Sequence, residues 1–194
     1  TEIPDVHKEK DFEYKLDLQY VRCVWAAIQK LPKSERIPVE KIIKQSLSQR
    51  NVAWVVRLKL YYKYTNEQIK KRLLSISENP TVNDPIAGDA IKVLDLPVDS
   101  WADWKQSVYS DCLNPYLGSD DWTVDPRWLQ QAMSKKNNAL ALKTFRQYPF
   151  TANVLVTWFK MKQFELDCIR TAAEGLRLNV SSSEIKKIAG FEQL

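Results

Sequence analysis

The stretch from Thr151 to Asn179 constrains the fold most, because it is long, strongly apolar and free of proline. Its apolar positions recur at helical spacing, and they are Val154, Leu155, Trp158, Phe159, Phe164, Leu166, Ile169, Ala172, Ala173 and Leu176. Charged and polar residues fall between them, so the pattern predicts a helix of about seven turns. So wide an apolar face needs cover on more than one side. We therefore expect this stretch to be the core helix on which the other helices pack.

The scarcity of glycine narrows the fold class further. Only 4 of the 194 residues are glycine, whereas a β-sandwich or barrel needs many tight turns. The same scarcity removes most ways of building a phosphate-cradling loop. The 9 prolines fall mainly between the periodic runs. The sequence therefore predicts an all-α fold, an irregular multi-helix body in which two helical units look related.

The first half of the chain predicts two long helices. Asp11 to Lys30 has apolar residues at spacings of three and four, and Leu31 to Pro38, with two prolines, breaks the run. Val39 to Tyr64 reads as a second, longer helix. Its later part, NVAWVVRLKLYYKY, has a β-rich composition, so a strand is the competing interpretation there. The helical period running in from Val39 favours the helix.

Capping residues mark where several shorter elements begin. Thr65 with Gln68 forms a capping box for a short helix, and Ser100 with Asp103 at the third helical position opens another. Asp125 followed by Pro126 begins a helix that we expect to run to about Tyr148.

Two further segments complete the pattern. Asp89 to Leu94 adds one helical turn inside an otherwise irregular stretch. Ser181 with Glu184 caps a final short helix over 182–189. A long apolar helix followed by a capped short one therefore occurs twice, which indicates a degenerate internal repeat.

The charge distribution suggests a division into three ranges: 1–78 as a basic helical unit, 79–98 as a connector, and 99–194 as a C-terminal helical unit. Residues 1–77 hold 16 Lys and Arg against 9 Asp and Glu, a net charge of +7, and the remainder sums to −2. A basic half could meet an acidic protein, a nucleic acid or an anionic membrane face. The alternative is a solvated, lysine-rich surface.

Residues able to carry catalysis are scarce. His7 is the one histidine, which argues against a histidine-based triad or a metal site, and the three cysteines show no paired spacing. We interpret the acid pair Asp120–Asp121 as turn residues whose carboxylates make local hydrogen bonds. We predict no catalytic residue, no metal and no cofactor, and hence a protein that is not an enzyme.

Three further expectations concern the exposure of the tryptophans, the cellular compartment and the start of the chain. Six of the seven tryptophans lie in apolar helical registers, and we expect Trp122, in a turn, to be the exposed one. Reduced thiols, the absence of a signal-peptide pattern and the absence of a membrane-spanning run indicate a cytoplasmic protein. The chain opens without methionine, as a piece of a longer protein would.

Two stretches resemble a known family, the C-type subunits of the archaeal and bacterial A/V-type rotary ATPases, which are called d-type subunits in the eukaryotic V-type enzymes. The first is KQFELDCIR, residues 162–170, followed by Gly175, against a family pattern of approximately K-E-x-E-I-R-N-L-R and a later glycine. Lys162, Glu165 and Arg170 match, whereas Asp167 and Cys168 depart from the pattern.

The second stretch is Arg50–Asn51–Val52 through Arg57–Leu58–Lys59, which is similar to the family's segment D-x-x-N-L-x-x-L-L-R-x-K. Asn51, Arg57 and Lys59 match in kind, and the leading acid is missing. Since Glu165 and Arg170 are five residues apart, each more naturally anchors a neighbouring helix, with Arg57 as the expected partner of Glu165. Gly175 would permit close helix approach.

The resemblance implies a fold, a function and partners. The fold implied is built from repeated helical units around a funnel, and the function is that of a non-catalytic central-stalk coupling subunit. Such a subunit links the rotor shaft to the membrane rotor ring, is cytoplasmic and lies peripheral to the membrane. Arg57, Lys59, Glu165, Arg170 and Gly175 would be its structural and interaction residues. Since family members are longer, this chain would be a shortened version or a C-terminal piece.

Two alternatives come from other functional classes. A helical nucleic-acid-binding module would use the basic first half, and its affinity would fall steeply with salt. A helical protein-interaction adaptor would dock a partner helix in a groove.

Overall fold

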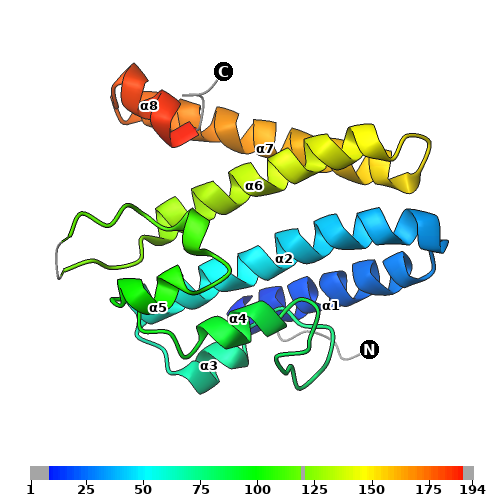
Figure 1. The fold of residues 1–194 in the computed structure, drawn as a ribbon, viewed down its shortest axis with the longest axis horizontal. Helices are drawn as coiled ribbons and strands as arrows, with labels where there is room; N and C mark the ends of the chain where they lie inside the picture. Colours follow the sequence, from blue (N-terminus) through cyan, green and yellow to red (C-terminus); the bar gives the residue numbers. More distant parts are fainter. Residues whose placement is uncertain (1–8, 119–120, 190–194) are drawn as a thin grey trace.

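The computed structural model describes residues 9–118 and 121–189, and the regular secondary structure in these ranges is helical. The predicted all-α class is confirmed (Figure 1). The elements in chain order are α1 (Glu9–Gln29), α2 (Lys33–Tyr62), α3 (Asn66–Lys70), α4 (Gly88–Val93), α5 (Trp101–Lys105), the 3-10 turn η2 (Ser110–Cys112), α6 (Pro126–Gln147), α7 (Ala152–Arg177) and α8 (Ser182–Ala189).

The helix at the centre of the body is α2. It contacts α1 and α4 on one side and α6 on the other, while α6 and α7 form an antiparallel pair at the edge of the molecule (Figure 1). Its buried positions include Val39, Ile42, Val52, Val55 and Val56. In α7 only Asn153, Thr157 and Cys168 are buried. The prediction that 151–179 is the core helix is therefore wrong, because the broad apolar face of α7 points away from the body.

The main hydrophobic core lies between α2, α6 and the short elements α3 to η2. Its members come from all parts of the chain, for example Val56 on α2, Val93 on α4, Trp104 on α5 and Leu129 on α6. A smaller cluster of Val21, Leu47, Leu74 and Ile86 joins α1 to α2 and the segment after α3. Side chains from 1–78, 79–98 and 99–194 thus share one core, and the division into three folding units stays a prediction.

The start of α2 differs from the prediction. The helix begins at Lys33 and contains Pro38, rather than starting after that proline. The backbone N–H groups of Glu35 and Arg36 donate to the carbonyl of Pro32, so the first turn forms directly after Pro32. A proline in the second turn removes one hydrogen bond of the helix, and that loss did not stop it. The strand alternative for the later part of α2 is wrong, because the helix continues to Tyr62.

The predicted caps are confirmed where the structure describes them. Thr65 and Gln68 form both bonds of the capping box, at 3.3 and 3.0 Å. The Asp125 carboxylate accepts from the first backbone N–H groups of α6. The Ser100 hydroxyl accepts from the backbone N–H of Asp103. The predicted turn of helix at 89–94 is α4, and α8 has its predicted bounds, whereas the Glu184 side chain lies outside the described residues.

Candidate interaction surface

Glu165 and Arg170 both lie exposed on α7, and each pairs within its own helix. Glu165 accepts from Lys162 Nζ at 2.6 Å, and Arg170 lies 3.8 Å from Asp167. Arg57 donates instead to Gln130 Oε1 on α6 at 2.5 Å. The expected Arg57–Glu165 pair is therefore not formed, and Arg57 ties α2 to α6. These two pairs and a third on α7, Arg177–Glu174, are surface pairs, which contribute little to stability and leave the charges available to a partner.

Lys59 joins α2 to the end of α4. Its ammonium donates to the carbonyl oxygen of Leu94 and, at 3.0 Å, to that of Leu96. These carbonyls lie at and beyond the C-terminus of α4, where a positive charge complements the helix dipole. Burial lowers the pKa of Lys59, and the nearby Asp95 partly opposes that shift. Lys59 therefore holds the fold together rather than facing a ligand.

Asn51 is the one motif residue that the structure shows to be more important than the sequence indicated. It is 1% exposed, and its amide donates to the carbonyls of Leu74 at 2.7 Å and Ile86 at 3.2 Å. Its Oδ1 accepts from the backbone N–H of Leu74 at 2.9 Å. This one side chain thus links α2 to the segment after α3 and to the loop before α4. The resemblance pointed to this asparagine, but sequence spacing could not show what it would bind.

Gly175 lies where α8 folds back on α7. A Cβ at this position would come within 2.7 Å of Ile185 Cγ1, which is closer than real carbon contacts allow. Ile185 is 8% exposed and packs into the space that the missing side chain leaves. The glycine therefore permits the close helix approach that we expected from it.

The outer face of α7, defined here by its six large apolar residues, is exposed to solvent. These residues are Leu155, Trp158, Phe159, Leu166, Ile169 and Leu176, between 45% and 65% exposed. Single exposed apolar side chains are ordinary, but a contiguous stripe along one helix makes this face the candidate interaction surface. The opposite, inner face carries the small or polar residues Asn153, Thr157 and Gly175, against α6 and α8.

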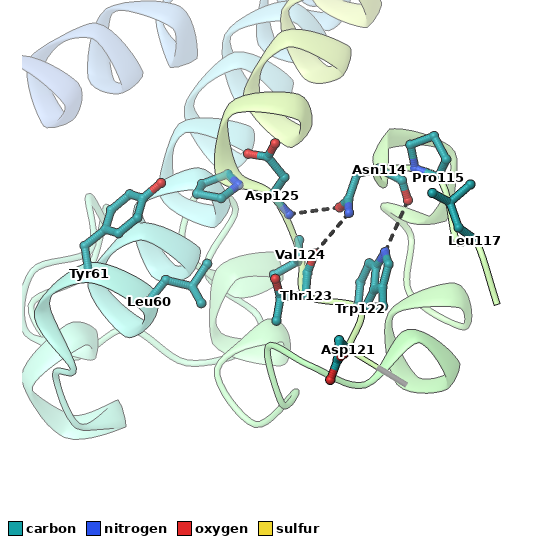
Figure 2. A pocket seen from close by; sticks show the side chains of 11 residues that line it. Leu60, Tyr61, Asn114, Pro115, Leu117, Asp121, Trp122, Thr123, Val124 and Asp125 are labelled. Carbon is teal, nitrogen blue, oxygen red and sulfur yellow. Dashed lines mark hydrogen bonds between the residues drawn. The ribbon is translucent and has the colours of Figure 1, made fainter. Parts of the chain in front are cut away.

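A hollow of about 540 Å³ lies between the end of α2 and the loop before α6 (Figure 2). The polar groups of Asn114 on its wall are occupied by the chain itself. Its Oδ1 accepts from Asp125 N at 2.9 Å, its Nδ2 donates to Thr123 O at 3.0 Å, and its carbonyl accepts from Trp122. These bonds fix the loop, so they leave no convergent set of free polar groups on this wall.

Trp122 and its surroundings correct a prediction. Trp122 is 6% exposed and stacks edge-on against Trp101, while Trp54 and Trp158 are each more than 40% exposed. The expectation that Trp122 is the exposed tryptophan is therefore wrong, because the loop carries its ring into the core. Val108, in the turn after α5, is 79% exposed. His7 and Asp120 lie outside the described residues.

Metal sites and membrane spans are both absent from the part of the chain that the structure describes. No group of three or more His, Cys, Asp or Glu side chains in 9–118 and 121–189 is placed to hold a metal ion. None of the helices in these ranges is long and apolar enough to cross a bilayer.

Comparison with known proteins gives one family. The model of the ATP synthase (C/AC39) subunit family matches residues 3–188 of this chain. A Treponema pallidum (strain Nichols) protein with the recorded name "Uncharacterized protein" is 25% identical over 170 residues, covering 84% of this chain and 48% of the relative. The chain thus spans about half the length of the curated relative it matches. No solved structure gives a significant match.

Proposed function

Because this chain belongs to the ATP synthase (C/AC39) subunit family, we propose that it is a non-catalytic central-stalk coupling subunit of an A/V-type rotary ATPase. In this role it links the rotor shaft to the membrane rotor ring, on the cytoplasmic side and peripheral to the membrane. The match over residues 3–188 carries the proposal, because it runs through every helix from α1 to α8 rather than through one short motif.

The structure supports this role in two ways. A coupling subunit has to transmit force without deforming, and Asn51 and Lys59 tie α2 to the segments on either side of α4 through buried or half-buried hydrogen bonds. It also has to bind neighbouring subunits, and the outer face of α7 offers an exposed apolar surface for that purpose. A rigid body with an apolar edge is what a torque-transmitting connector needs.

The test is purification of the tagged native-length protein from its own cells in mild detergent, with the co-purifying proteins identified by mass spectrometry. We expect rotor-shaft subunits and a small ring-forming membrane protein to be recovered together. An unrelated tagged protein at the same expression level is the control. Recovery of nucleic-acid machinery, or of no rotary ATPase component, would contradict the proposal.

A further inference from the structure

The apolar residues on the exposed side of α7 follow a coiled-coil spacing. Leu155, Phe159, Leu166, Ile169, Ala173 and Leu176, with Lys162 in the one remaining place, succeed each other at alternating steps of four and three residues. All seven are exposed. This is the a/d pattern of a heptad repeat, sustained here over about three heptads. We call these seven positions the α7 seam.

The seam is separate from the contacts that hold α7 in the fold. The helix is fastened from its other side, where the Asn153 amide donates to Thr144 O of α6 and Lys160 donates to Ser46 of α2. Ile185 of α8 packs at Gly175, also off the seam. A helix whose apolar residues repeat every seven positions packs best against a second helix. The two helices then form a left-handed supercoil and cross at about 20°. The spacing therefore indicates a helix as the occupant of the seam.

Charges flank the seam on both edges. Glu165 directly precedes the seam residue Leu166, while Arg170 and Arg177 directly follow Ile169 and Leu176. These are the g and e positions of the heptad, which select the partner and its orientation. Side-chain exposures of 57% for Glu165 and 71% for Arg170 leave both able to reach a second helix.

The charges argue against a second copy of the chain as the occupant. Parallel self-pairing would place Lys162 against Lys162 in the middle of the seam, where like charges would be desolvated together. Antiparallel self-pairing about the centre of the seam would place Glu165 against Glu165. A different helix with an acidic residue opposite Lys162, acidic residues along the Arg170–Arg177 edge and a basic residue opposite Glu165 satisfies all of these positions.

We propose that the α7 seam is the docking site of one α-helix of another protein, packed as a two-stranded coiled coil with an acidic residue of that helix opposite Lys162. The proposal rests on the proposed function for its setting, since it says how a neighbouring subunit is held. The assignment follows from the exposed heptad spacing and from the charges within and beside it.

Two synthetic helical peptides test the chemistry of the partner. Both carry leucine at their seam positions except the central one, which is Glu in the first peptide and Lys in the second. Their residues facing the Arg170–Arg177 edge are Glu and Lys respectively, and both peptides carry Lys opposite Glu165. Binding to the full chain is measured by fluorescence anisotropy. We expect the acidic peptide to bind at least about tenfold more tightly than the basic one. Lys162→Glu should reverse that preference, and Leu166→Asp should abolish binding of both.

Matched controls keep the result interpretable. Val108→Asp changes an apolar residue that is 79% exposed and lies in the turn between α5 and η2, so it should leave peptide binding unchanged. Thermal melts by circular dichroism should be the same for wild type, Leu166→Asp and Val108→Asp, because both positions are exposed. A lower melting temperature for Leu166→Asp alone would overturn the proposal, since the residue would then be part of the protein's own core.

Three other results would also overturn the proposal. Equal affinity for the two peptides, or none for either, would remove the charge selection. A concentration-dependent dimer in sedimentation that Ile169→Asp abolishes would make a second copy the occupant. Binding to phosphatidylserine–phosphatidylcholine vesicles that Leu166→Asp abolishes, without peptide selectivity, would make it a membrane surface.

The outcome separates this proposal from the proposed function. If Leu166→Asp still co-purifies with shaft and ring subunits, the coupling role stands and the seam is not its docking site. If wild type recovers no rotary ATPase component while the acidic peptide binds selectively, the seam stands and the coupling role falls.

Discussion

The two longest helices, α2 and α7, use their apolar faces in opposite ways. The apolar side of α2 is buried between α4 and α6, with Val52, Val55 and Val56 fully covered. The apolar side of α7 is exposed, and its buried residues are Asn153, Thr157 and Cys168. The comparison teaches that helical periodicity identifies the apolar side of a helix. It does not say whether the rest of the protein covers that side or leaves it exposed.

The reason lies in how α7 is attached. Thr157 donates to the carbonyl of Asn153 at 2.7 Å, and Asn153 donates to that of Thr144 on α6 at 3.0 Å. Small and hydrogen-bonded residues on the inner face let α7 lie against α6 without consuming its large apolar side chains. Those side chains remain exposed, so α2 is the scaffold and α7 carries the surface that we propose as the contact element.

The sharpest test of this difference is the same substitution in both helices. Leu58 on α2 is 6% exposed and Leu166 on α7 is 45% exposed. Leu58→Ala removes buried methyl groups and leaves a cavity, so we expect a loss of about 2–5 kcal/mol in the free energy of unfolding. Leu166→Ala should change it by less than about 0.5 kcal/mol. Urea denaturation followed by circular dichroism measures both, and equal losses would show that the outer face of α7 is covered in the isolated protein.

Two buried asparagines, Asn51 on α2 and Asn153 on α7, extend the comparison. Replacing the one on α2 should lower the free energy of unfolding more. Asn51→Ala leaves the backbone groups of Leu74 and Ile86 without their partner, and we expect a loss of about 3 kcal/mol. Asn153 bonds through its amide alone, since its buried Oδ1 has no hydrogen-bond partner in the described residues, so Asn153→Ala should cost about 1 kcal/mol. Chemical denaturation of the two variants side by side measures both losses in the free energy of unfolding. A larger loss for Asn153→Ala than for Asn51→Ala would contradict the prediction.

Gly175 tests the C-terminal end of α7. Gly175→Ala gains helix propensity but brings a methyl group against Ile185. We therefore expect the free energy of local opening of α8 to fall by about 1 kcal/mol, while that of the core is unchanged. Hydrogen exchange at the amides of α8 measures this, with those of α2 as internal reference. Adding Ile185→Ala should remove the clash, so the double variant should lose no more protection in α8 than Ile185→Ala alone. Unchanged exchange in the single variant would mean that α8 is not held where the structure places it.

Lys160 gives the smallest expected effect, and it depends on pH. Burial of its ammonium, together with the nearby Arg50, lowers the pKa of Lys160. The unfolded chain therefore binds this proton more tightly, so the residue costs stability at neutral pH and the cost vanishes as the pH rises towards the unfolded value of 10.5. Lys160→Met should raise the free energy of unfolding by about 0.5 kcal/mol at pH 7.

The pH dependence is the decisive readout for Lys160. The advantage of Lys160→Met should shrink between pH 7 and pH 10, measured by denaturation at each pH. Lys162→Met, on the exposed side of the same helix, is the matched control for loss of a lysine charge. An advantage for Lys160→Met that grows with pH would contradict the assigned cause.

Much of the local structure follows directly from local chemistry. The capping box at Thr65, the Asp125–Pro126 helix start and the turn at Asn179, which has a φ of 55°, were all predictable, because each depends on a few adjacent residues. The all-α class followed from the scarcity of glycine and the helical periods. The family was visible in two short stretches, and residues 3–188 match it.

Other features were decided only by tertiary structure. The broad apolar face of α7 looked like a core, but α2 occupies the core because its apolar residues meet those of α4, α5 and α6. Trp122 was expected outside, yet the bonds of Asn114 fold its loop inward. Burial depends on what comes to lie against a surface, and contacts between distant segments set that. The sequence by itself therefore determined where the helices form and which faces are apolar, and the packing determined which of those faces were left for a partner.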